Sequence, residues 1–119
     1  MKKTIFIIED DNHLLSMMKD YLEYLGHNTI TASNGMDGLK MLKSEKYDLV
    51  ITDIVMPYVS GVGIISVIKE ESAGLPVIAI TAHGKTPERL AAEKRADVVL
   101  RKPFEMKKLT DYVVELLGC

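Results

Sequence analysis

The sequence has few of the residues that mark specialised protein classes. Its only cysteine, Cys119, stands at the end, which excludes an internal disulfide framework and a cysteine-based metal cluster and suits a reducing cytoplasm. The apolar run of residues 4–8 is far too short for a signal-peptide core or a membrane span. No repeat, low-complexity run or Pro/Gly/Ser-rich linker interrupts the 119 residues, so we expect one cytoplasmic domain over residues 1–119.

An excess of charge of one sign is also missing. With 15 basic and 17 acidic residues, the formal net charge is -2, so the sequence lacks the excess of positive charge that binding to nucleic acid or an anionic membrane requires. Hydrophobic residues at 47% and charged residues at 27% are ordinary values for a folded domain and exclude a disordered chain. We therefore expect a folded, soluble domain that binds neither nucleic acid nor a membrane.

Four short apolar runs have the length and the boundaries of buried β-strands, and a fifth run is weaker. The four lie at residues 5–8, 49–51, 77–80 and 98–100, and the weaker one at residues 28–32. Between these runs, apolar residues recur at steps of three and four, which predicts helices. The helices are expected around residues 14–25, 39–42, 62–68 and 109–117, with a more polar one that Thr86 caps and Pro87 opens.

This alternation of strands and helices predicts an α/β fold. Each helical crossover carries the chain back over a face of the sheet, so consecutive strands pair in parallel. We expect a doubly wound, five-stranded parallel sheet with the flavodoxin-like strand order 2-1-3-4-5 and helices on both faces. In such sheets ligands bind beyond the carboxyl ends of the strands, where the strand order reverses.

Polar side chains stand at the ends of the apolar runs. They are Glu9, Asp10 and Asp11 after the first run, Asp53 after the third, Thr81 after the fourth and Lys102 after the fifth. The expected strand order places Asp10 beside Asp53, and carboxylates packed this closely require raised pKa values or a bound cation, for which Mg2+ fits best. A carboxylate nucleophile, Mg2+, a lysine and a hydroxyl together suit phosphoryl transfer onto Asp53.

Four sequence motifs carry these residues: residues 7–11 (IIEDD), 51–57 (ITDIVMP), 80–82 (ITA) and 102–104 (KPF). In this order and at this spacing they resemble the receiver domains of response regulators in two-component signal transduction, including the chemotaxis-regulator type. The resemblance covers essentially the whole chain.

The resemblance implies a role for each matching residue. Asp53 is the phosphoacceptor, Asp10 and Asp53 bind Mg2+ directly, Glu9 contributes through a water or a weaker contact, and Val55 adds its backbone carbonyl.

The resemblance also implies the anion-binding residues and the partners. Lys102 pairs with the phosphoryl oxygens, Thr81 moves its hydroxyl to the phosphate, and the Lys102-Pro103 peptide bond is cis. The donor is a sensor histidine kinase or a phosphotransfer protein, which docks on the exposed face of residues 12–18. The chain catalyses only its own phosphorylation and dephosphorylation, so it is not an enzyme with an external substrate, and it controls an output domain or partner.

The sequence departs from the family pattern at two places. Val55 and His83 stand at the two positions that, in receiver domains, border the phosphoryl group and influence hydrolysis, and Val55 cannot orient a water through its side chain. We therefore expect slow dephosphorylation. Val99 replaces the aromatic residue that changes rotamer on activation in many receiver domains, which puts the usual coupling to Thr81 in doubt.

Each of these residues also has a simpler interpretation. Taken alone, Asp53 is a strand-end turn residue, Thr81 a β-branched strand residue and Lys102 a surface lysine. Asp11 fits a cap of the following helix. The three histidines, His13, His27 and His83, lack zinc-site spacing and are expected at the surface or at helix flanks.

Rival functions remain at this point. One rival is an interaction module that keeps the fold but works without phosphorylation. The presence of the full set Asp10, Asp53, Thr81 and Lys102 argues against it. A haloacid-dehalogenase-type phosphatase places Asp-x-Asp after its first strand, where this chain has Glu9-Asp10-Asp11. A nucleotide-binding domain would need a glycine-rich loop after the first strand, which this sequence lacks. The cognate kinase, the output partner, a phosphorylation-dependent dimer and the choice between a stand-alone regulator and part of a longer protein stay open.

Overall fold

The centre of the molecule is a parallel sheet of five strands. The structure, a computed structural model, describes residues 2–56, 61–82 and 95–118. The strands are β1 (Thr4–Ile8), β2 (Asn28–Ala32), β3 (Leu49–Asp53), β4 (Val77–Thr81) and β5 (Val98–Arg101). They pair in parallel in the order β2-β1-β3-β4-β5, which confirms the predicted fold class and strand order.

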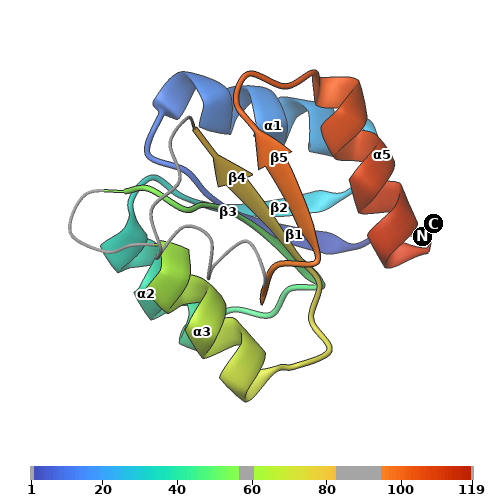
Figure 1. The fold of residues 1–119 in the computed structure, drawn as a ribbon. Helices are drawn as coiled ribbons and strands as arrows, with labels where there is room; N and C mark the ends of the chain where they lie inside the picture. Colours follow the sequence, from blue (N-terminus) through green and yellow to red (C-terminus); the bar gives the residue numbers. More distant parts are fainter. Residues whose placement is uncertain (1, 57–60, 83–94, 119) are drawn as a thin grey trace.

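Helices cover both faces of this sheet, as predicted. They are α1 (Asn12–Tyr24), α2 (Gly35–Ser44), α3 (Gly61–Glu71) and α5 (Met106–Leu117). Figure 1 shows α1 and α5 on one face and α2 and α3 on the other. The expected helix that Pro87 opens lies outside the described residues.

The sheet separates two hydrophobic cores. Side chains alternate along a strand, so Ile5 and Ile7 of β1 join the core under α1 and α5, while Phe6 and Ile8 join the core under α2 and α3. All four side chains are completely buried. A strand buried on both faces has a continuous apolar sequence, which is why this strand was evident from the sequence.

Strands β3 and β4 extend beyond the apolar runs that predicted them and end in buried polar residues. Strand β3 ends at Asp53 rather than Ile51, and β4 ends at Thr81 rather than Ile80. Both terminal side chains are polar yet buried, with Asp53 4% exposed and Thr81 fully buried. A count of apolar residues stops too early here because these polar side chains belong to the buried carboxyl edge of the sheet.

The strand register brings the predicted polar residues to that edge. Ile8, the last residue of β1, pairs with Thr52, while Asp53 pairs with Ile80 and Thr81 pairs with Arg101. Glu9 follows Ile8 directly, and Lys102 follows Arg101 directly. The residues that continue from β1, β3, β4 and β5 therefore lie side by side.

His27 flanks α1, which agrees with its expected place at the surface or at a helix flank, and it is buried, with an exposed fraction of 8%. Gly26, with φ of 96°, supplies a backbone conformation that other residues rarely adopt and turns the chain into β2. The His27 backbone N–H then donates to the Leu22 carbonyl at 3.1 Å, which keeps the residue against the helix end.

Candidate functional site

Three carboxylates from two neighbouring strand ends form a cluster at the carboxyl edge of the sheet. One oxygen each of Glu9, Asp10 and Asp53 lies within 4.8 Å of the others. Glu9 is completely buried and Asp53 is 4% exposed, whereas Asp10 is exposed to solvent. The cluster is therefore closed on the protein side and open to solvent at Asp10.

Glu9 is the most deeply placed acid of the cluster. Its Oε2 accepts a hydrogen bond from the Asp11 backbone N–H at 3.0 Å. Its Oε1 lies 3.2 Å from Lys102 Nζ, but the geometry is not that of a hydrogen bond, and this oxygen has no hydrogen-bond partner among the described residues. Burial raises the pKa of Glu9 to about 8, and the charge of Asp53 adds to this rise.

Asp53 has both carboxylate oxygens in contact with donors. Its Oδ2 accepts from Lys102 Nζ at 3.0 Å, and its Oδ1 accepts from the Val55 backbone N–H at 3.1 Å. Burial lowers the pKa of Lys102, but the hydrogen bond and charge of Asp53, together with Glu9, outweigh it and leave this pKa raised. Lys102 is thus a charged partner shared by the two buried acids.

Thr81 and Lys102 are connected through the backbone. The Lys102 backbone N–H donates to the Thr81 carbonyl at 2.7 Å, which continues the pairing of β4 with β5 past its last register pair. The Thr81 hydroxyl donates to the Ala82 carbonyl at 3.2 Å. The Lys102-Pro103 peptide bond is cis, as the resemblance implies.

Of the three residues at which the sequence departs from the family pattern, the structure describes Val55 and Val99. The Val55 side chain is 44% exposed, so it stands at the rim of the site. Val99 is partly buried and packs against the core under α2 and α3. His83 lies outside the described residues.

The carboxylate cluster has the composition and charge of a divalent-cation site. With Glu9 ionised, three carboxylates and one lysine carry a formal charge of -2, which one dication balances. The buried, unpartnered Glu9 Oε1 gains a partner when a cation binds nearby. The three oxygens lie within 4.8 Å of one another, which is close enough for them to face one cation.

Asp11, the third acid of the loop, caps helix α1 as predicted. Its Oδ1 accepts hydrogen bonds from the backbone N–H groups of His13 at 3.0 Å and Leu14 at 3.2 Å. These two donors lack partners within the helix, and an N-cap side chain satisfies them. Asp11 thus points toward α1 rather than into the cluster.

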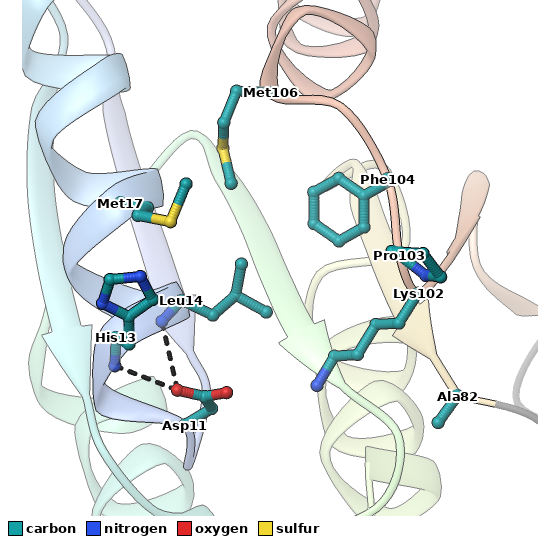
Figure 2. Close-up of a pocket in the computed structure, with 9 residues that line it drawn as sticks. All are labelled: Asp11, His13, Leu14, Met17, Ala82, Lys102, Pro103, Phe104 and Met106. Carbon is teal, nitrogen blue, oxygen red and sulfur yellow. Dashed lines mark hydrogen bonds between the residues drawn. The ribbon is translucent and has the colours of Figure 1, made fainter.

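A groove of about 540 Å³ lies next to the site (Figure 2). It is lined by Asp11, His13, Leu14 and Met17 of α1 and the loop before it, by Ala82, and by Lys102, Pro103, Phe104 and Met106. Figure 2 shows Lys102 extending from this groove toward the end of β3, where it reaches Asp53. The predicted docking face of residues 12–18 borders the groove. The sequence did not predict that Phe104 and Met106 line its other side, because these residues are distant in sequence from residues 12–18.

Among the helices that the structure describes, none combines the length and hydropathy that crossing a membrane requires.

Comparisons with known proteins agree with this arrangement. The response regulator receiver domain family matches residues 5–114. The transcriptional regulatory protein GlrR of Escherichia coli K12 is 33% identical over 114 residues, which are 95% of this chain and 26% of GlrR. The polar-differentiation response regulator DivK of Brucella anthropi is 29% identical over 121 residues, which cover 99% of this chain and 98% of DivK.

Solved structures show the same similarity. The structure of response regulator TrrA from Thermotoga maritima, in complex with Mg2+-BeF, has a TM-score of 0.85 and 32% identity and covers 96% of this chain and 98% of TrrA. The chain spans between 26% and 49% of the length of the first curated regulators it matches. The match therefore concerns a part of those regulators.

Proposed function

The chain belongs to the response regulator receiver domain family, and from this premise we propose that Asp53 accepts a phosphoryl group in a Mg2+-dependent reaction. The observation that carries the proposal is the contact of Lys102 Nζ with Asp53 Oδ2 at 3.0 Å and with Glu9 Oε1 at 3.2 Å. A buried nucleophilic carboxylate, a second acid and a cation thereby meet at the strand edge where such sheets bind ligands.

Glu9, Asp10 and Asp53 are the proposed metal ligands, with the backbone carbonyl of Val55 as a fourth. Bound Mg2+ neutralises charge on the phosphoryl oxygens during transfer. The charge of -2 that the cluster and its lysine carry when Glu9 is ionised, and the unpartnered oxygen of Glu9, support this assignment. The Mg2+-BeF complex of the similar TrrA also supports it.

The transfer itself exchanges one bond to phosphorus for another. An Asp53 carboxylate oxygen forms a bond to phosphorus, while the bond from phosphorus to the donor imidazole nitrogen breaks and its electron pair stays on the imidazole. Lys102 then stabilises the charge of the phosphoryl oxygens, for which its existing contact with Asp53 positions it. Thr81 turns its hydroxyl from the Ala82 carbonyl toward the same oxygens.

We assign the partners by the same premise. Receiver domains of response regulators pair with histidine kinases and output domains, and we propose a sensor histidine kinase or phosphotransfer protein as the donor here. The apolar groove beside Asp53, with Leu14 and Met17 on its α1 side, is the proposed docking place. Residues 1–119 act as one cytoplasmic receiver domain that catalyses its own phosphorylation and dephosphorylation and controls an output domain or partner.

The test is intact-protein mass spectrometry after incubation with acetyl phosphate, with and without Mg2+. The wild type should gain one phosphoryl group only with Mg2+, through breakage of the phosphorus–oxygen bond to acetate. Asp53→Asn should gain none. Asp20→Asn, which changes an exposed aspartate on α1, should behave as the wild type.

An unmodified wild type under all conditions would instead favour the rival function, an interaction module that works without phosphorylation. An adduct that persists in Asp53→Asn would place the phosphoacceptor elsewhere.

A further inference from the structure

The loop between β1 and α1 contains only residues 9–11, and Asp11 is its one acid outside the carboxylate cluster. Asp11 connects the two sides of this loop. Its side chain accepts hydrogen bonds from His13 N–H and Leu14 N–H on α1, while its own backbone N–H donates to Glu9 Oε2 at 3.0 Å. One residue therefore joins the start of the helix to the buried acid of the site.

We propose that Asp11 is a positioning residue, which holds the loop in the conformation that brings Glu9 and Asp10 to Asp53. This inference rests on the proposed function, because it concerns the metal affinity of that same cluster. Asp11 contacts neither the metal nor the phosphoryl group; it acts by fixing the residues that do.

The fixed ends of the loop explain how this works. On one side, the Glu9 backbone N–H donates to the Ala32 carbonyl at 3.1 Å and so ties the loop to β2. On the other side, Leu15 N–H donates to the Asp11 carbonyl at 2.9 Å, which is the first turn of α1. Asp10 lies between these anchors, so the backbone of the loop sets the place from which its exposed side chain reaches Glu9 and Asp53.

Loss of the Asp11 side chain weakens the anchor on the α1 side, because it removes the two side-chain hydrogen bonds of the cap. The backbone N–H groups of His13 and Leu14 would then hydrogen-bond to water instead, and the first turn of α1 would loosen. The donor to Glu9 Oε2 belongs to the same residue, so the orientation of the Glu9 carboxylate would loosen with it. Residues that orient metal ligands in this way change metal affinity by about 10- to 100-fold when they are lost.

Two substitutions separate the cap from the charge of Asp11. Asp11→Ala removes both the acceptor oxygen and the negative charge, whereas Asp11→Asn keeps an acceptor oxygen at the cap and removes only the charge. Asp11→Gly also removes the side chain, but glycine is tolerated at an N-cap, so this variant keeps the test usable if Asp11→Ala does not fold.

Asn34 provides a matched control for lost helix capping. It is the N-cap of α2, where its side chain accepts from the Asp37 backbone N–H at 2.8 Å, and its connections do not include the acids of the cluster. Asn34→Ala therefore removes a comparable cap at a helix that does not hold the site. A merely structural role of Asp11 would make the two alanine variants alike.

The experiment measures the Mg2+ dissociation constant by titration calorimetry and the rate of phosphorylation by acetyl phosphate, with folding checked by circular dichroism. Asp11→Ala, or Asp11→Gly, should bind Mg2+ about tenfold or more weakly and react more slowly. Asp11→Asn and Asn34→Ala should stay within about twofold of the wild type, although Asn34→Ala unfolds at a lower urea concentration.

Three results would decide against the inference or its premise. Wild-type affinity in folded Asp11→Ala or Asp11→Gly would overturn it. If Asp11→Asn bound Mg2+ as weakly as Asp11→Ala, the charge of Asp11 and not its helix cap would set the affinity, and the inference would be overturned as well. A wild type that binds no Mg2+ and gains no phosphoryl group would instead refute the proposed function.

Discussion

Lys102 holds its ammonium group between two carboxylates that otherwise repel each other. It lies 3.0 Å from Asp53 Oδ2 and 3.2 Å from Glu9 Oε1, and its side chain is 28% exposed. On the proposed function, a phosphoryl group on Asp53 would use the same ammonium, so phosphorylation would redistribute the partners of Lys102. The ion pair would then be part of a switch and not only a source of stability.

Val55 places an apolar side chain at the rim of the site. Its backbone N–H is occupied by Asp53 Oδ1, and its apolar side chain cannot orient an attacking water, whereas asparagine can hydrogen-bond one. We expect Val55→Asn to hydrolyse phospho-Asp53 severalfold faster than the wild type. Intact mass followed over time after removal of acetyl phosphate measures this.

Val114→Asn is the matched control for this prediction. Val114 lies on α5 and is 44% exposed, as is Val55, so the substitution makes the same change of polarity outside the site. Phosphoryl lifetimes that are equal in the wild type and both variants would contradict a shielding role for Val55.

His27 makes the stability of the domain depend on pH in a predictable direction. Burial lowers its pKa below 6.5, and its Nδ1 has no hydrogen-bond partner within residues 2–56, 61–82 and 95–118. Below pH 6.5 the unfolded chain therefore binds the proton more readily, so stability is lost as the pH falls through the lowered pKa of the folded state. His27→Gln should lose less stability between pH 7.5 and pH 5.5 than the wild type does.

Urea unfolding at the two pH values measures this difference. His13→Gln, which changes an exposed histidine, serves as the control and should follow the wild-type dependence. The same loss of stability in His27→Gln as in the wild type would show that other groups cause it.

At the scale of the elements, glycines of two helices meet different surroundings. A Cβ on Gly38 of α2 would lie 2.9 Å from Ile8 Cγ2, whereas a Cβ on Gly63 of α3 would meet nothing within 4 Å. Ile8 is completely buried and belongs to β1, so α2 packs closely on the sheet at Gly38. Alanine is favoured over glycine in both helices, so any difference between Gly38→Ala and Gly63→Ala should come from the packing around the added methyl group.

We therefore expect opposite effects of the same substitution. Gly38→Ala should destabilise the domain by about 1–3 kcal/mol, because the added methyl group overpacks the core. Gly63→Ala should be neutral or stabilise by up to about 1 kcal/mol. Urea unfolding gives both values, and a stabilising Gly38→Ala would show that Ile8 moves aside at little cost.

The elements also differ in how well the sequence predicted them. Strands β1, β3 and β4 are central and buried on both faces, so their apolar runs are continuous. Strand β2 lies at an edge with only Ala32 buried, and its sequence signal was accordingly weaker. Burial of the polar Asp53 and Thr81 comes from long-range packing, which a local pattern does not contain.

At the scale of the whole molecule, the site is assembled from residues that are almost a whole chain apart. The strand order made the meeting of Asp10 with Asp53 predictable, because the ends of β1 and β3 are neighbours. Which acid is buried was not predictable, since all three loop acids look alike in sequence. Only the structure distinguishes the buried Glu9 from the exposed Asp10 and from Asp11, which caps α1.

A site built from distant segments exists only in the folded chain, so a ligand that binds there should stabilise the whole domain. If Mg2+ binds the cluster, at about 100 times its dissociation constant it should add about 2.7 kcal/mol to the free energy of unfolding. This gain should disappear in Asp53→Asn, which removes one charge of the cluster, and persist in Asp20→Asn. Urea unfolding with and without Mg2+, at an ionic strength kept constant with NaCl, tests this. A gain of equal size in Asp53→Asn would mean that Mg2+ stabilises the domain from another place on its surface.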